Sequence, residues 1–326
     1  MHSSVARDVL GEIERIAGRE DGDPVLPGYT AFPYSAERFE GLKAEESRLA
    51  FVDGGNAELL HTPSFSVFLV RAYFSVFEAG LKVKAKRHEF YALCSAEPGI
   101  RYRTKIFPLH EGCIIPDESD MTFDAEDPTI RDGIFAADIS RMGGIIRKFA
   151  EWKLAACVPA KDCIIVMDGT LQAGMTNETK YAEDAFAQAR MRRSAVSAVA
   201  KTSSVYTTTG NNLLAVLQKN APPGAWQYRF AGNSATEVYA AKLHHSSRHA
   251  FRIDVMKGFN PLPCIASHCN DYRFPGYPYG LSDAHMFGKI EDAEKLQHKA
   301  LFLSSSRHRA HISTGDAHGI LDALVR

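Results

Sequence analysis

Two Asp-Gly turns, each placed after an apolar run, are the residues of this sequence best suited to catalysis. Asp53 lies in the segment FVDGGN and Asp168 in the segment VMDGT. Each would put a carboxylate at the tip of a strand, where the following glycine lets the backbone turn away. Two such acids can share two divalent cations roughly 3.5–4 Å apart, which bind the attacking and leaving oxygens of a phosphodiester. Asp-Gly is also a common turn dipeptide without a function, so the signal is the pair and not either turn alone.

A third metal ligand is expected from a helix between these two turns. Glu151 lies in the segment RKFAEW, near the end of a helix predicted over 130–157 and beside its apolar stripe. It could instead form an ion pair with Arg147, four residues earlier. On spacing alone Asp138 is an equal alternative.

The elements that would hold these acids follow from hydrophobic periodicity. Runs at 49–52, 65–77, 81–93 and 101–109 predict strands, and 163–167 is apolar throughout, as in a strand buried on both faces. Helices are predicted over 130–157, 178–200 and 282–296, and later strands over 226–230, 238–243 and 250–255. Three strands, a helix, a strand and a helix, in this order, are RNase H-like. We therefore expect an α/β fold with an RNase H-like mixed sheet, flanking helices and additions.

Five segments occur in the order in which NurA nucleases carry them, and over about residues 45–325 the chain resembles that family. The segments are VDGGNAEL, the helix with Glu151, MDGTL, AKTS and GYPYGLSDAH. The resemblance implies that Asp53, Glu151, Asp168 and His285 bind manganese or magnesium, as two ions. It also implies that Lys201 assists at the scissile phosphate. The expected domain organisation is an N-terminal helix and extended arm over 1–44 and one NurA nuclease domain over 45–326.

Two positions depart from the family, whose members carry serine where Gly55 and Thr170 stand. Both are mild departures, because the expected ligand is the nearby aspartate. An imidazole among carboxylates, as His285 would provide, fits manganese better than magnesium.

The function that the resemblance implies is that of a metal-dependent DNA nuclease, a 5′-to-3′ exonuclease with single-strand endonuclease activity. It would act as a homodimer with a HerA-type hexameric ATPase in end resection at double-strand breaks. Lys201-Thr202 lacks the upstream glycines of a phosphate-binding loop, so we expect no ATP motor in this chain. The alternatives are an RNase H-like enzyme acting on RNA, a related phosphotransferase, and an inactive scaffold for an ATPase.

The formal net charge of −1 excludes a global basic field, so single-stranded DNA and duplex ends would have to be held by local patches. The residues expected to contact DNA are Arg190, Arg192, Arg193, Arg248, Arg252 and Tyr206.

No signal peptide and no apolar run of membrane-spanning length is visible, so a soluble, cytoplasmic protein is expected. Cys264, His268 and Cys269 lie close together in the sequence, but they supply only three of the four ligands of a structural zinc site. We expect reduced thiols there.

Overall fold

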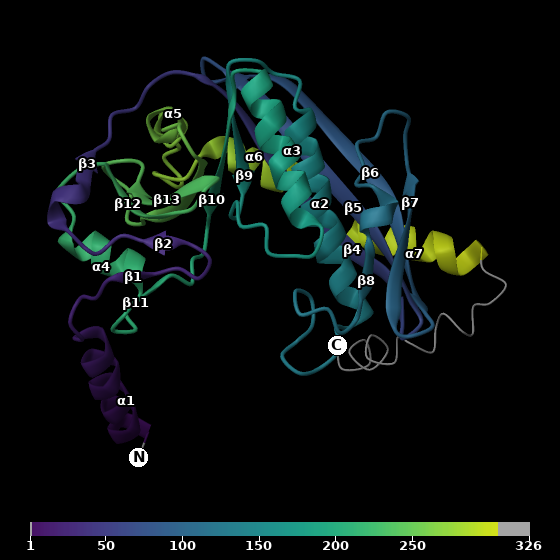
Figure 1. Ribbon diagram of the computed structural model, residues 1–326, viewed down its shortest axis with the longest axis horizontal. Coiled ribbons are helices and arrows are strands. Elements are labelled where there is room, and N and C mark those ends of the chain that lie inside the picture. Colours follow the sequence, from purple (N-terminus) through teal and green to yellow (C-terminus); the bar gives the residue numbers. More distant parts are fainter. Residues whose placement is uncertain (1, 306–326) are drawn as a thin grey trace. The chain divides into compact units, whose positions relative to one another are not determined.

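The computed structural model describes residues 2–305 and divides into two compact units, here called unit 1 and unit 2 (Figure 1). Unit 1 takes its described residues from Met1–Leu49, Asp168–Leu171 and Ala195–Tyr279. Unit 2 takes them from Ala50–Met167, Gln172–Ser194 and Gly280–Arg326. Each is described by itself below.

Long strands form the sheet of unit 2, in the order β9-β4-β5-β6-β7-β8. They are β4 (Arg48–Thr62), β5 (Phe65–Glu78), β6 (Leu81–Glu97), β7 (Arg101–Pro108), β8 (Thr122–Asp124) and β9 (Cys163–Asp168). β5, β6, β7 and β8 form an antiparallel meander, as the period-2 runs predict. β5 is buried along nearly its whole length, because it lies inside the sheet and carries β-branched and aromatic residues on both faces.

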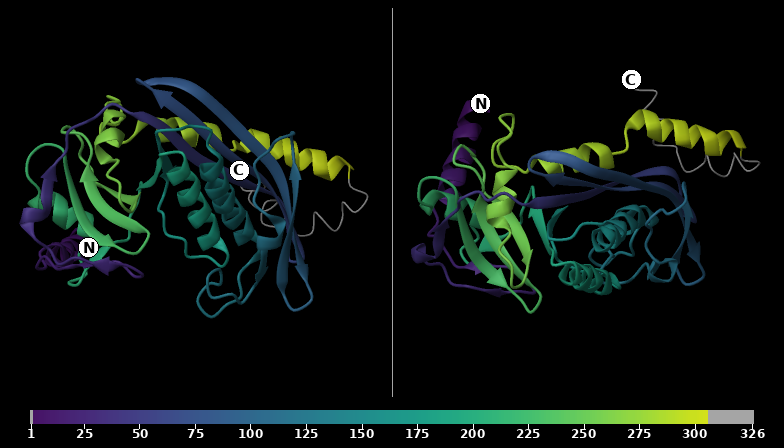
Figure 2. Two further views of the ribbon diagram at one scale, coloured as in Figure 1. Left: turned by 45° about the horizontal axis from the view of Figure 1, so that its top comes forward. Right: turned by 90° about the horizontal axis from the view of Figure 1, so that it is seen from above.

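Helices cover both faces of this sheet. α2 (Met142–Cys157) and α3 (Glu178–Met191) lie on one side of β4, β5 and β6, and α6 (Tyr279–Gly288) and α7 (Asp292–Ser305) lie on the other (Figure 2, right). Trp152 of α2 packs edge-on against Phe186 of α3, and Phe302 of α7 packs edge-on against Tyr91 of β6. The order of three strands, helix, strand and helix is present, so the predicted RNase H-like α/β class with a mixed sheet and flanking helices is confirmed.

Unit 1 is built on a smaller antiparallel arrangement, in the order β12-β13-β14-β10. Its strands are β12 (Trp226–Gly232), β13 (Thr236–Lys242), β14 (Phe251–Met256) and β10 (Ala195–Ala200), with β2 (Thr30–Ala31) and β3 (Phe39–Gly41) on the outer side of β12 and a separate pair of β1 (Pro24–Val25) and β11 (Tyr206–Thr207). Its helices are α1 (His2–Ala17), α4 (Leu213–Asn220) and α5 (Leu262–Ser267). Trp226, Tyr228 and Phe230 are buried against Leu213 and Leu217 of α4.

Three predicted helices have different bounds. The helix predicted over 178–200 ends at Met191, after which Arg193 adopts a left-handed φ of 54° and Ala195–Ala200 becomes strand β10. All six residues of β10 are buried, so this run has no polar stripe that would expose one side of a helix. The helix predicted over 130–157 begins only at Met142, after the short 3-10 turn Ile139–Arg141. The helix predicted over 282–296 is two helices, α6 and α7.

No helix within residues 2–305 combines the length and the apolar character needed to cross a membrane.

Candidate metal centre and strand-binding residues

Asp53 lies inside strand β4 and not at a turn, which corrects the prediction from the sequence. β4 continues through both following glycines to Thr62. A Cβ at Gly54 would lie 2.8 Å from the carbonyl oxygen of Arg71 and 3.0 Å from Oε1 of Glu151. Glycine is therefore required here for close approach of neighbouring atoms, because a methyl group would have no space.

Glu151 of α2 lies beside this glycine. Its side chain is only 3 % exposed, and Oε1 is among the atoms nearest to Gly54, the residue after Asp53. Arg147, one turn earlier on α2, donates to the same oxygen, so the ion pair considered from the sequence is present as well. A buried carboxylate is costly unless a cation accompanies it, and Arg147 is one such cation.

His285 of α6 completes this group of residues in unit 2. Its Nδ1 lies 3.0 Å from Oδ2 of Asp53, while the backbone N–H of Gly54 donates to Oδ1 at 2.7 Å. The carboxylate of Asp53 is buried and the imidazole of His285 is more than half exposed. Asp53 and His285 are thus in direct contact, while the carboxylate of Glu151 lies against Gly54, the next residue of β4.

Two further glycines allow α6 to approach β4 this closely. A Cβ at Gly280 would lie 2.1 Å from the ring of Phe51, and a Cβ at Gly55 would lie 2.3 Å from the carbonyl oxygen of Gly288. The glycine at position 55, where the resembling family carries serine, is thus explained by the end of α6, which passes directly over it.

Asp168, Lys201 and Tyr277 form a second group, within unit 1. Asp168 is the last residue of β9, and Gly169 follows with a φ of +99°, so the Asp-Gly turn predicted here is present. Nζ of Lys201 donates to Oδ2 of Asp168 at 2.8 Å, and the Tyr277 hydroxyl donates to Oδ1 at 3.4 Å. The sequence predicted that Lys201 follows the end of a helix. In the structure it follows strand β10 instead. Tyr277 was missed as a site residue; its place in the segment GYPYG was the only available signal.

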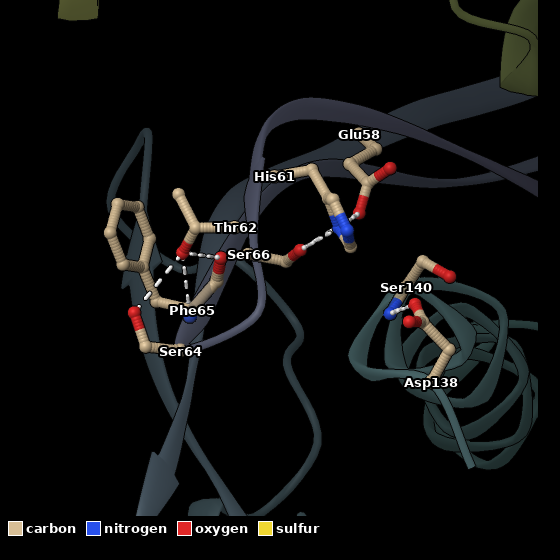
Figure 3. Close-up of polar contacts among 8 residues, drawn as sticks. All are labelled: Glu58, His61, Thr62, Ser64, Phe65, Ser66, Asp138 and Ser140. Carbon is tan, nitrogen blue, oxygen red and sulfur yellow. Dashed lines mark hydrogen bonds and ion pairs between the residues drawn. The ribbon is translucent and has the colours of Figure 1, made fainter. Parts of the chain in front are cut away.

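Asp138, the alternative to Glu151, caps the 3-10 turn that precedes α2 (Figure 3). Its Oδ1 accepts the backbone N–H of Ser140 at 2.8 Å. Burial raises the pKa of this carboxyl, but the hydrogen bonds from Ser140 outweigh it and hold the pKa below the usual range. In the same view His61 lies within 3.0 Å of both Glu58 and Ser66. Capping this turn therefore gives Asp138 a structural role that requires no metal ion.

The first basic run is only partly available to a ligand. Arg190 is exposed. Arg192 donates to the carbonyl oxygens of Ala156 and Val158 at 2.6 and 3.3 Å, which satisfies acceptors at the end of α2. Arg193 is exposed and makes a bidentate pair with Asp162, at 2.7 Å for both contacts.

The second basic run contains one exposed and one buried arginine. Arg248 is exposed, and Tyr206 is 55 % exposed. Arg252 is 5 % exposed and makes a bidentate pair with Asp254, at 2.7 and 2.9 Å. The expectation that Arg252 contacts DNA at the surface is corrected here, because its guanidinium is buried within β14.

Cys264, His268 and Cys269 do not bring three ligand atoms together in the part of the chain that the structure describes. Cys269 and His268 are buried, and burial raises the pKa of the Cys269 thiol and lowers the pKa of His268 to about 4.

Among solved structures the chain is similar to nucleases. No protein-family model and no curated protein sequence matches it. The crystal structure of a NurA protein matches with a TM-score of 0.57 and 10% identity, over 95% of this chain and 98% of that one. The NurA nuclease from Sulfolobus solfataricus matches with a TM-score of 0.49 and 12% identity, over 84% and 89%. Endonuclease V from Ciona intestinalis, in complex with DNA, matches with a TM-score of 0.41 and 8% identity, over 79% and 92%. The first of these matches shows that this chain has a NurA-like fold.

Proposed function

We propose that this chain, starting from its NurA-like fold, is a metal-dependent DNA nuclease. The observation that carries the proposal is the contact of the buried Asp53 with His285, with the buried carboxylate of Glu151 against the neighbouring Gly54. These three residues are the ligands that the resemblance assigns within unit 2. The fold alone does not decide function, because one fold supports many chemistries. The site residues are therefore the basis of the proposal.

The donor set fits a divalent cation. The carboxylates of Asp53 and Glu151 are each about 3 % exposed, and both border the same glycine. The negative charge of buried carboxylates is costly unless positive charge accompanies it. Arg147 offsets part of this charge, and a bound cation would offset the rest. Two carboxylates and one imidazole suit manganese better than magnesium.

We further propose that Asp168 is also a metal ligand and that the chain holds two ions. When bound, they would supply Lewis acidity and an activated water for phosphodiester hydrolysis. Lys201, oriented by its hydrogen bond to Asp168, would bind a non-bridging oxygen of the scissile phosphate and stabilise negative charge as it develops. Tyr277 would keep the carboxylate of Asp168 in place through the second oxygen.

The test is cleavage of labelled single-stranded DNA, duplex DNA and RNA with manganese, with magnesium or with a chelator. Asp53→Asn and Asp168→Asn should abolish cleavage and leave folding intact, because an amide keeps the shape but loses the charge that holds the cation. The matched control is Asp138→Asn, which should retain activity, since asparagine caps as well as aspartate. Full activity of either site variant in manganese would overturn the proposal. Loss of activity in Asp138→Asn with full activity in Glu151→Gln would move the third ligand to Asp138.

We also propose a more specific activity, that of a 5′-to-3′ exonuclease with single-strand endonuclease activity. The enzyme would be a homodimer and would work with a HerA-type hexameric ATPase in end resection. Its support is the sequence resemblance and the lack of a phosphate-binding loop in this sequence. Exposed Arg190, Arg248 and Tyr206 are the proposed contacts to the strand, so DNA binding should weaken as salt rises. Degradation of kilobase-length duplex should increase greatly when the ATPase and ATP are added. Efficient digestion by this chain alone would refute the dependence on a motor.

A further inference from the structure

A second cluster of metal-ligating side chains lies in unit 2 and uses none of the acidic residues above. His88 belongs to β6, and His110 and Cys113 belong to the connection between β7 and β8. One ligand atom from each of the three lies within 4.8 Å of the other two. The ring centroids of the two histidines are 5.8 Å apart. None of these residues has a role in the nuclease proposal.

The connection between β7 and β8 turns back onto β6 in a way that presents these side chains together. His110 and Cys113 have the spacing His-x-x-Cys, and Gly112 between them has a φ of +65°, which tightens the turn. The backbone N–H of Ile114 donates to Nδ1 of His88 at 3.0 Å. The lone pair of His88 therefore points toward the same segment that carries the other two ligands.

The hydrogen bonds of the histidines define which nitrogens carry the lone pair. His88 is 1 % exposed and accepts at Nδ1, so its proton is on Nε2, which is buried without a hydrogen-bond partner among the described residues. Nδ1 of His110 contacts the carbonyl oxygen of Glu111 at 3.1 Å and must carry the proton there, which leaves the lone pair on Nε2. An N–H to backbone carbonyl contact of this kind commonly orients a metal-binding histidine.

We propose that Nδ1 of His88, Nε2 of His110 and Sγ of Cys113 bind a zinc ion. Imidazole and thiolate without carboxylate form a donor set that favours zinc over magnesium or calcium, which take oxygen ligands. Three protein ligands leave the fourth tetrahedral position to water. The site is independent of the proposed nuclease centre. With its fourth position open it is not a closed structural site, but the ion would link the connection between β7 and β8 to β6.

The three ligand atoms must move somewhat closer together to bind one ion. Zinc–nitrogen and zinc–sulfur bonds of about 2.0–2.3 Å place tetrahedral ligand atoms roughly 3.3–3.6 Å apart. His110 and Cys113 are only half-buried and lie in a turn, so side-chain rotation can bring them inward. The N–H of Ile114 gives up its acceptor when zinc takes the lone pair of His88.

The proton balance of binding gives an independent readout. Burial raises the pKa of the Cys113 thiol, and the thiol donates to the carbonyl oxygen of Glu89 at 3.4 Å. Binding breaks the S–H bond, forms the S–Zn bond and releases one proton to the buffer. Lys86, whose Nζ lies 3.4 Å from the carbonyl oxygen of Gly112, favours the thiolate.

The experiment uses the full chain, freed of metal with a chelator, and adds zinc or cobalt. We expect one thiolate-bound metal ion per chain, with release of about one proton, and with cobalt a near-ultraviolet thiolate-to-metal charge-transfer band, which no centre of carboxylates and imidazole can give. Cys113→Ser should remove the band, and His110→Ala should weaken binding by more than the roughly 10–100-fold that loss of an outer contact costs. Both residues are half-buried, so neither variant leaves a large cavity.

Cys264→Ser is the matched control, because Cys264 is also half-buried, its thiol pKa is also raised by burial, and it lies near a second histidine in the sequence. This variant should keep the band and the affinity. Absence of a charge-transfer band in the unmodified protein, or an equal band in Cys113→Ser, would overturn the proposal. Cleavage of DNA plays no part in either measurement, so failure here leaves the proposed nuclease untouched.

Discussion

Replacement of Gly55 by alanine should destabilise the protein and disturb the Asp53–His285 pair. The added Cβ would lie 2.3 Å from the oxygen of Gly288, 3.1 Å from its carbonyl carbon and 3.3 Å from Cα of Lys289. All three are backbone atoms, so no side-chain rotation relieves the contact. The end of α6 would have to move by about 1 Å, and overpacking of this kind typically costs about 1–3 kcal/mol.

The same movement acts on the proposed metal centre. His285 lies on α6, so a shift of about 1 Å would lengthen its 3.0 Å contact with Asp53 beyond hydrogen-bonding distance. Losing that contact adds about 1 kcal/mol, and the lower entropy of the unfolded alanine variant returns a little less than that. The net loss is about 2 kcal/mol. At about 2.1 cal/mol/K for each of roughly 300 residues, the melting temperature should fall by about 3 °C.

The assay is urea and thermal unfolding of Gly55→Ala, together with manganese-dependent cleavage of labelled DNA. Gly41→Ala is the matched control, because Gly41 also lies in a strand but has open space around it. Gly55→Ser, which restores the residue of the resembling family, should be as harmful as alanine. If Gly55→Ala were as stable and active as Gly41→Ala, the explanation of this glycine by the approach of α6 would be wrong.

Three further predictions test other parts of the argument. Arg252→Met should lower the free energy of unfolding by about 3–5 kcal/mol, since it removes the cationic partner of the buried Asp254. The salt dependence of DNA binding should stay unchanged; a reduced salt slope would return Arg252 to the residues that contact DNA. Lys201→Met should reduce cleavage at least about tenfold while stability changes by less than about 1 kcal/mol, because its ion pair is partly exposed; unchanged single-turnover rates would exclude it from the site. Burial lowers the pKa of His268 to about 4, so the unfolded chain takes up the proton first as the pH falls, and stability is lost below pH 6.5. Between pH 7 and pH 5 this residue should account for a loss of about 2 kcal/mol in the free energy of unfolding, measured with urea. His268→Gln should lose less stability than the unmodified protein over that interval.

The sequence predicted the strands of unit 2 well, because β-branched and aromatic residues recur there with a clear period. The prediction failed where a run had only one polar position. In Ala195–Ala200 neither helix nor strand periodicity is visible, and the segment forms a strand that is buried on both faces. The turn predicted after Asp53 was wrong for a related reason. Two consecutive glycines are compatible with a turn or with the close approach of another element, and only the position of α6 shows that the second applies.

The candidate site was predictable only as far as single residues carry a signal. Asp53 was named from the pair of Asp-Gly segments and His285 from the resemblance, and the two contact each other in the structure. Arg147 and Tyr277 were not named as site residues, because an arginine on a helix and a tyrosine in a loop are common throughout any sequence. Arg252 was assigned to the surface because its charge pattern contains no information about the buried Asp254 beside it.

The contact between Asp53 and His285 joins residues 232 positions apart, and this separation has a consequence for synthesis on the ribosome. The strand with Asp53 leaves the ribosome well before α6 does. Until α6 has emerged and folded, the carboxylate of Asp53 has no imidazole beside it. A nascent or prematurely terminated chain therefore carries the acids and basic residues without a complete set of ligands. The order of translation would thus leave the proposed metal centre incomplete until α6 has been made.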